Sequence, residues 1–304
     1  MAEKLDEEQK QAPVISSDVE ETSTSSNCIN ESALVRKLDL RLLPSITILY
    51  LLSFLDRANV ANARLEGLTA DLHMTGNQYL TGLTLYFIGY VIFEIPSNIV
   101  LKRTSPQLWL PSLTLGWGIV ATLMGVTQNM AGFFAVRFVL GAPEAGLFPG
   151  CVYYMPMWYK RRERQYRIAL FFSAASLAGA AGGILAYGIA FMNGVGHYRG
   201  WRWIFIIEGL VTVVVSVLAY FFIVNYPNTA KFITDDERDA IQARLKADSD
   251  ATRHEEFNWT NVKSALFDYK PWLYGLAFHT MSLPLYTLSL FLVSHSGSTL
   301  WTPY

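Results

Sequence analysis

Charged residues are scarce in this sequence. They make up 16% of the 304 residues, whereas hydrophobic residues make up 52%. A typical soluble domain carries about 25% charged residues. Because the deficit is concentrated in long apolar blocks, it indicates segments that cross a lipid bilayer rather than a large soluble core. The sequence therefore predicts an all-α membrane protein.

Cysteines, nucleic-acid-binding features and enzyme motifs are also few or missing. Cys28 and Cys151 are the only cysteines and lie far apart, so neither a disulfide framework nor a metal cluster is expected. The net charge is −1 and no basic stripe is present, which argues against a nucleic-acid partner. HExxH, GxSxG and an intramembrane Gly-Asp pair are absent, so we expect neither an enzyme nor a cofactor.

The N-terminus lacks the apolar core of a signal peptide. Residues 1–36 are acidic and rich in serine and threonine. Such a composition cannot bury enough apolar surface to fold. We expect a disordered tail on the cytoplasmic side.

Seven apolar blocks are long enough to cross a bilayer, for which about 20 residues are needed. They are Leu42–Ala61, Tyr79–Leu101, Leu108–Thr127, Ala131–Tyr154, Tyr166–Phe191, Trp203–Val224 and Trp272–Val293. The first six form a predicted six-helix bundle over residues 37–225. A polar loop over 226–270 and a seventh helix over 271–293 follow, and residues 294–304 form an atypical tail.

The order of these segments resembles half of a two-half carrier. Carriers with internal repeats bind substrate between their halves. Here the tail VSHSGSTLWTPY follows the seventh helix without an apolar helical pattern, so we expect a truncated chain. Within the polar loop, Thr234 and Glu237 form a capping box and predict a short surface helix.

Lysine and arginine in the short loops predict the orientation, since cytoplasmic loops carry an excess of both. With the N-terminus in the cytoplasm, the inside segments carry Arg36, Lys37, Arg41, Lys102, Arg103 and the KRRER run from Lys160 to Arg164. The outside loops then hold few cations. A cytoplasmic N-terminus is therefore expected.

Four charged residues lie inside or at the end of apolar segments, where each charge costs roughly 2.5–3.5 kcal/mol on insertion scales. Asp56 and Arg57 end the first segment, and Arg137 and Glu144 lie seven residues apart in the fourth. Seven residues make nearly two helical turns, so Arg137 and Glu144 share a face. A cation and carboxylates in one cavity suit a proton-coupled anion carrier. The alternative is that the four form neutral structural pairs, for example Asp56 with Arg137.

Several motifs resemble those of the anion:cation symporter family of the major facilitator superfamily, in particular its fungal allantoate, nicotinate and related organic-acid permeases. The motifs are LDRANVANA, FEIPSNIVLKR, RFVLGAPEAGLFPG, WYKRRERQYRIALFFSAASLAGAAGG and GWRWIFIIEG. The resemblance runs from about Lys37 to Leu292. It implies a twelve-helix carrier with alternating access, in the plasma membrane.

The resemblance also implies roles for the four intramembrane charges. Arg57 is assigned to the substrate carboxylate, Asp56 and Glu144 to proton coupling, and Arg137 to the substrate site, where it pairs with the acids. Lys102, Arg103, Arg161 and Arg162 are assigned to a cytoplasmic gate, with simple positive-inside anchoring as the alternative.

Further polar and small residues also carry expectations. Aromatic side chains could stack on a planar substrate or simply pack; they are Tyr86, Tyr90, His279 and Tyr286. Glu208 is expected either to pair with Arg202 or to line the cavity. A stripe of small residues in the fifth segment, from Ala174 to Ala190, allows a neighbouring helix to approach closely, and is expected to face lipid or another chain here.

The sequence thus predicts proton-coupled symport of a small organic anion of the nicotinate, allantoate or pantothenate class. The alternative is a truncated half-carrier that does not transport, or that associates with an intact relative. Self-association is possible because the second half is missing.

Overall fold

Every element in the described part of the chain is helical. The computed structural model describes residues 30–248, 263–264 and 267–300. The α-helices are α1 (Glu31–Leu65), α2 (Leu68–Asp71), α3 (Gly76–Arg103), α4 (Pro106–Met124), α5 (Met130–Glu144), α6 (Leu147–Tyr154), α7 (Arg161–Ala190), α8 (Gly200–Phe222), α9 (Asp235–Ala247) and α11 (Tyr269–Leu300). Short 3-10 turns are η1 (Met155–Met157), η2 (Val195–His197) and η3 (Pro227–Thr229). The prediction of an all-α fold is confirmed.

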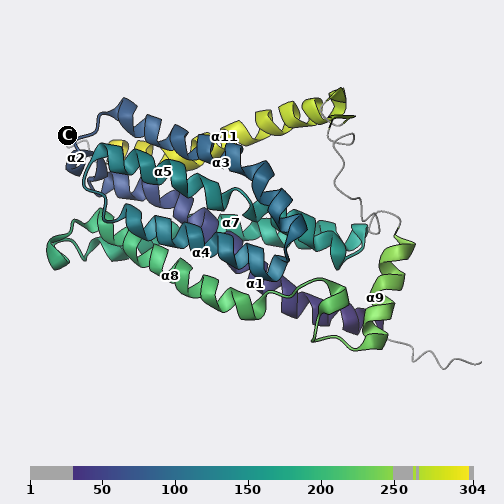
Figure 1. Cartoon of the computed structure of the whole chain (residues 1–304). Helices are drawn as coiled ribbons and strands as arrows, with labels where there is room; N and C mark the ends of the chain where they lie inside the picture. The colour runs from purple at the N-terminus through teal and green to yellow at the C-terminus, as the bar shows by residue number, and fades with distance from the viewer. Residues whose placement is uncertain (1–29, 249–262, 265–266, 301–304) are drawn as a thin grey trace, which may run out of the picture.

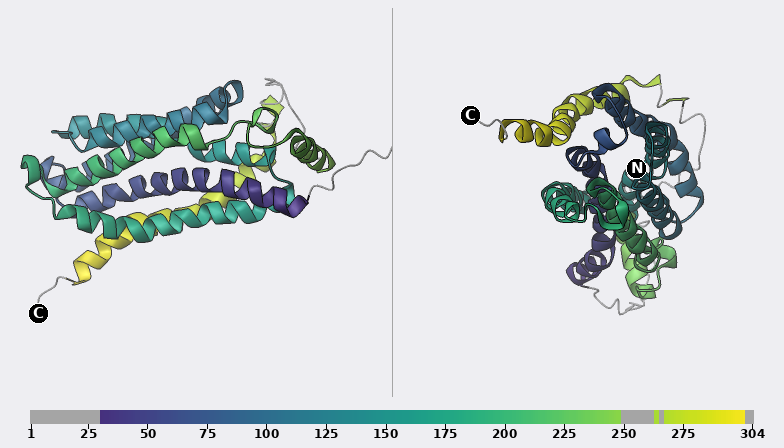
Figure 2. Two further views of the ribbon diagram at one scale, coloured as in Figure 1. Left: turned by 90° about the horizontal axis from the view of Figure 1, so that it is seen from below. Right: turned by 90° about the vertical axis from the view of Figure 1, so that its left-hand side faces the viewer.

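The long helices lie side by side as one bundle, and α11 runs along its outside next to α1 (Figures 1 and 2). The main helix pairs join segments far apart in the sequence: α4 packs on α8, α3 on α5, and α1 on α7. Five spans in the described part of the chain are long and apolar enough to cross a membrane, namely α1, α3, α5 with α6, α7 and α8. Helix α4, predicted as a crossing segment, is present but is not among these five.

Helices extend into both terminal segments that the sequence predicts to be tails. Helix α1 begins at Glu31 because the side chain of Asn30 caps it, accepting hydrogen bonds from the backbone N–H groups of Ser32 and Ala33. The last residues of the predicted tail are therefore helical, and residues 1–29 lie outside the described residues. At the other end, α11 continues to Leu300, through most of the segment predicted to lack a helix.

Two glycines allow α3 and α5 to lie very close together. A Cβ atom on Gly141 would clash with the backbone of Tyr86 and Tyr90, and one on Gly89 would clash with the backbone of Phe138. The absence of side chains at both positions lets the two backbones touch. The same contact places the cavity-facing side chains of α3 opposite those of α5.

The small residues of α7 do not form one lipid-facing stripe. Ala174, Ala178 and Gly182 are buried, and Gly182 faces Leu55 and Ala58 of α1. The neighbouring row behaves differently, because nothing lies within 4 Å of a Cβ on Gly179. The buried row is thus a packing surface for α1, which corrects the expectation that the stripe faces lipid or another chain.

Candidate functional site

A cavity of about 250 Å³ lies between four helices of the bundle. Its polar lining is concentrated in four charged residues, Asp56 and Arg57 of α1 and Arg137 and Glu144 of α5. Tyr86 and Phe87 of α3 and Ala175, Ser176 and Gly179 of α7 line it as well, together with Phe54, Ala58, Val60, Leu83 and Leu140. The structure therefore brings together the four charges that the sequence singled out.

Arg57 and Glu144 form an ion pair inside the bundle. The Arg57 Nε lies 2.5 Å from Glu144 Oε1, and Ser53 Oγ, one turn earlier on α1, donates to the same oxygen at 3.0 Å. The guanidinium also donates to the Tyr86 hydroxyl at 3.0 Å. Since the Glu144 side chain is only 1% exposed, its charge depends on these donors.

Aromatic rings support the Arg57 guanidinium from two sides. Its central carbon lies 5.1 Å from the ring centre of Phe54 and 5.4 Å from that of Tyr90. A guanidinium over an aromatic face is attracted by the ring quadrupole. Tyr90 therefore helps to hold the Arg57 side chain beside the cavity, although it is not among the residues that line the cavity.

Asp56 points away from Arg57, because consecutive helical residues are rotated by about 100°. The indole Nε1–H of Trp117 on α4 donates to Asp56 Oδ2 at 2.8 Å. The Thr212 hydroxyl on α8 lies 3.5 Å from the same oxygen. Asp56 thus reaches from the cavity into the contact between α1, α4 and α8.

Arg137 is a buried cation that packs against an aromatic ring. Its side chain sits against the face of Phe133, 5.3 Å from the ring centre, and the residue is 3% exposed. Among the described residues, its Nε and Nη2 atoms have no hydrogen-bond partner. The pairing therefore differs from the one expected: Glu144 binds Arg57, and Arg137 keeps two donors beside the cavity.

The remaining predicted site residues lie in different places. Tyr86 lines the cavity. His279 is exposed on α11, and the Tyr286 side chain lies outside the described residues. The predicted gate residues are exposed at helix ends away from the cavity, where Lys102 lies 5.8 Å from the ring centre of Tyr153; they are Lys102, Arg103, Arg161 and Arg162.

Three neighbours of these charges were missed from the sequence: Ser53, Trp117 and Asn59, whose Nδ2 lies 3.5 Å from Asp56 Oδ1. Ser53 lies one turn before Arg57, a spacing that places both on one face. Trp117 offers no comparable signal, because the pairing of α4 with α1 cannot be read from either segment alone. Nor does the predicted link between Glu208 and Arg202 form, since Arg202 binds Asp71 at 3.1 Å.

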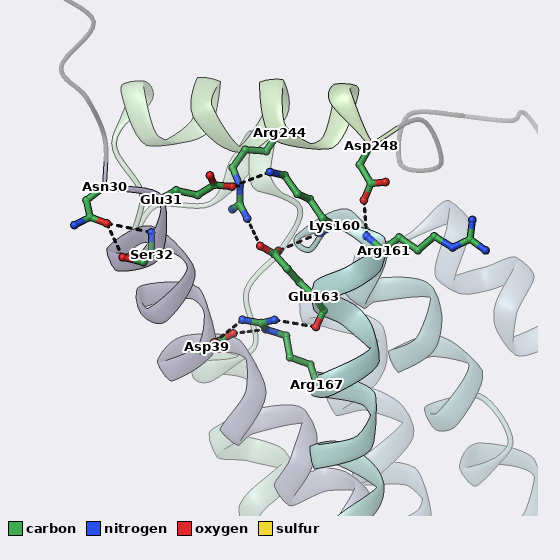
Figure 3. A network of polar contacts seen from close by, with 10 residues as sticks. All are labelled: Asn30, Glu31, Ser32, Asp39, Lys160, Arg161, Glu163, Arg167, Arg244 and Asp248. Carbon is green, nitrogen blue, oxygen red and sulfur yellow. Dashed lines mark hydrogen bonds and ion pairs between the residues drawn. The ribbon is translucent and has the colours of Figure 1, made fainter.

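A second group of charges ties α9 to one end of the bundle (Figure 3). Glu31 at the start of α1 accepts from Lys160 and from Arg244 of α9, both at 2.7 Å, and Arg244 also reaches Glu163 of α7 at 2.6 Å. We call these four residues the α9 clasp. Lys160 and Glu163 of the KRRER run thus form ion pairs that the sequence did not predict.

Two further ion pairs flank the clasp. Arg167 of α7 binds Asp39 of α1 through two nitrogens, at 2.5 and 2.6 Å. Lys37 of α1 binds Glu237 at 2.7 Å, beside the confirmed capping box of α9. Burial opposes the ionisation of Glu237, but the hydrogen bonds from Lys37 and Thr234 outweigh it and lower its pKa.

The family model of the Major Facilitator Superfamily matches residues 46–304. The MFS transporter prlL of Fungal sp. (strain NRRL 50135) is 38% identical over 265 residues, which cover 85% of this chain and 54% of that protein. A protein of Agrobacterium vitis provisionally named as a tartrate transporter is 33% identical over 260 residues, which cover 86% of this chain and 59% of that protein.

Solved structures agree on the fold. A bacterial homologue of the human lysosomal transporter Spinster, inward-facing and occupied, superposes with a TM-score of 0.55 at 18% identity, covering 61% of this chain and 44% of that one. The chain spans about half the length of the curated relatives it matches. The family match covers most of the chain, and the helices that pack around the cavity follow the same fold. The chain therefore belongs to the major facilitator superfamily, a family of multi-pass membrane proteins.

Proposed function

We propose that the protein is a proton-coupled symporter of a small organic anion, of the anion:cation symporter type, working by alternating access. The observation that carries the proposal is Arg137. Two of its buried donors have no acceptor among the described residues, and leaving such donors unpaired is costly. A carboxylate in the cavity would supply two acceptor oxygens in the geometry that a guanidinium fork prefers.

The distribution of charge around the cavity supports an anionic substrate. The Arg57–Glu144 pair is neutral as a unit, and Asp56 is held by Trp117 on the side away from the pair. Arg137 is thus the cation left to face the cavity. An anion entering this space meets a positive charge in a poorly hydrated site, where electrostatic attraction is strong.

The same pair supplies a physical route for proton coupling. A proton on Glu144 removes the ionic part of its interaction with Arg57 and frees the Arg57 guanidinium for the substrate. Proton and anion then favour each other's binding, as symport requires. Asp56, which lines the same cavity, is the second proposed proton carrier.

Nicotinate, allantoate and pantothenate define the proposed substrate class. Phe54, Tyr86 and Phe87 line the cavity and offer ring faces to a planar molecule. The Agrobacterium vitis relative is named for tartrate, which is also a small carboxylate. We further propose that the N-terminus is cytoplasmic and that the protein resides in the plasma membrane.

The test is uptake of labelled nicotinate, allantoate, pantothenate and tartrate by cells that express the 304-residue chain. Arg137→Gln should weaken transport of the accepted anion about 10- to 100-fold, because a hydrogen bond to a charged group contributes about 1.5–3 kcal/mol. Arg36→Gln, an exposed arginine on α1, is the matched control. Uptake that is independent of pH, or equal in both variants, would refute the proposal.

A further inference from the structure

A polar cluster lies behind the cavity, where α1, α4 and α8 meet. Its members are Asp56 and Asn59 of α1, Trp117 of α4, and Glu208 and Thr212 of α8. Asn59 is 0% exposed and Glu208 is 4% exposed. Asp56 belongs to both the cluster and the cavity, so it connects the two.

The contact between Asn59 and Glu208 is half complete. Asn59 Nδ2 donates to Glu208 Oε2 at 2.6 Å. The other atom of each side chain, Asn59 Oδ1 and Glu208 Oε1, is buried and has no hydrogen-bond partner among the described residues. Both atoms are acceptors when Glu208 is ionised, so neither can satisfy the other.

One proton satisfies both atoms. A carboxylic acid and a primary amide can pair through two parallel hydrogen bonds, in which the amide N–H donates to the carbonyl oxygen and the acid O–H donates to the amide oxygen. A proton on Glu208 Oε1 would turn that atom into the missing donor. We propose that Glu208 and Asn59 form a proton-binding site that exchanges protons with the cavity through Asp56; this inference rests on the proposed proton-coupled function.

The charges around the site favour a proton there. Asp56 is the charged side chain of α1 that faces the cluster, and its Oδ1 lies 3.5 Å from Asn59 Nδ2. Helix α4 carries no charged residue, and α7 carries none after Arg167. Arg57, Arg137 and Glu144 lie on the cavity side of Asp56. Two neighbouring buried carboxylates repel each other, and one proton relieves this repulsion.

Infrared spectroscopy of the full chain in lipid nanodiscs at neutral pH tests the site without substrate or transport. The expected result is a carbonyl stretch of a protonated carboxyl group that disappears in Glu208→Gln. The fold should persist in this variant, because the Gln amide can donate to Asn59 Oδ1 as the acid does. Glu66→Gln, an exposed glutamate after α1, is the matched control and should leave the band unchanged.

A second variant protects the test against loss of folding. In Asn59→Leu the band should remain but move to higher frequency, because the carbonyl oxygen loses the Asn59 donor. The assignment would be overturned if the band survived in Glu208→Gln, if it were lost only in Asp56→Asn, or if sodium ions abolished it. Proton-coupled uptake without the Glu208 band would overturn this site alone, and the band without uptake would overturn the transport proposal alone.

Discussion

Replacing Arg57 with methionine removes the cation that faces Glu144 inside the bundle. Glu144, whose side chain is 1% exposed, would keep the Ser53 hydroxyl as a neutral hydrogen-bond donor to its Oε1 atom but would lose its cation. Breaking a buried ion pair by removing one partner costs about 3–5 kcal/mol. Because the Arg57 side chain is 19% exposed, water reaches its end of the pair, and we expect a cost near 3 kcal/mol.

Removing the other charge should cost less. In Glu144→Gln the amide oxygen can still accept from Arg57 and Ser53, so the loss is limited to the charge-assisted part of one hydrogen bond, about 1–2 kcal/mol. The double variant Arg57→Met/Glu144→Gln leaves no buried charge unpaired. Its destabilisation should therefore fall short of the sum of the single variants by about 2 kcal/mol.

The measurement is the free energy of unfolding of the four proteins in mixed micelles, followed by helical circular dichroism. We expect the double variant to lose less free energy of unfolding than the two single variants together. We also expect Arg57→Met to lose more than Glu144→Gln. Additive effects, within about 0.5 kcal/mol, would show that the two side chains do not interact in the folded protein.

Three further predictions concern packing and charge. Gly141→Ala should lower the free energy of unfolding by about 1–3 kcal/mol, because its Cβ meets the α3 backbone. Gly188→Ala, which meets nothing within 4 Å, should raise it by up to about 1 kcal/mol, and equal effects would refute the close helix contact. Trp117→Phe should destabilise by about 1.5–3 kcal/mol through the lost bond to Asp56, and an unchanged unfolding curve would contradict that bond. Since the pKa of Glu237 is lowered, its contribution to α9 docking should be complete above the ordinary glutamate value of 4.5 and disappear as the pH falls through the lowered pKa. Hydrogen exchange of α9 should rise over that acidic range, and Glu237→Gln should remove this pH dependence.

Helix positions and the shared face of Arg137 and Glu144 could be predicted from the sequence because both depend on local periodicity. Apolar blocks set the helices, and the seven-residue spacing set the face. Both side chains do line one cavity. The positions of the helix ends were predicted less well, because Asn30 caps α1 earlier than the apolar block begins.

Partner choice among the charges could not be predicted in the same way. Whether Glu144 meets Arg57 or Arg137 depends on the distance between α1 and α5, which side-chain packing sets in three dimensions. The same holds for Glu208, whose neighbour Asn59 comes from α1 while the expected partner Arg202 turns toward Asp71. The α9 clasp likewise joins residues from three segments and leaves no periodic signal in any of them.

Calorimetric titration of tartrate, nicotinate, allantoate and pantothenate into the purified chain, in buffers of different ionisation enthalpy, measures whether an anion and a proton bind together. We predict that one of these anions binds with net uptake of about one proton near neutral pH. Arg137→Gln should weaken this binding about 10- to 100-fold, and Glu144→Gln should abolish the proton uptake. Binding that takes up no proton, or that is equally strong in Arg137→Gln, would contradict proton-coupled anion binding at this cavity.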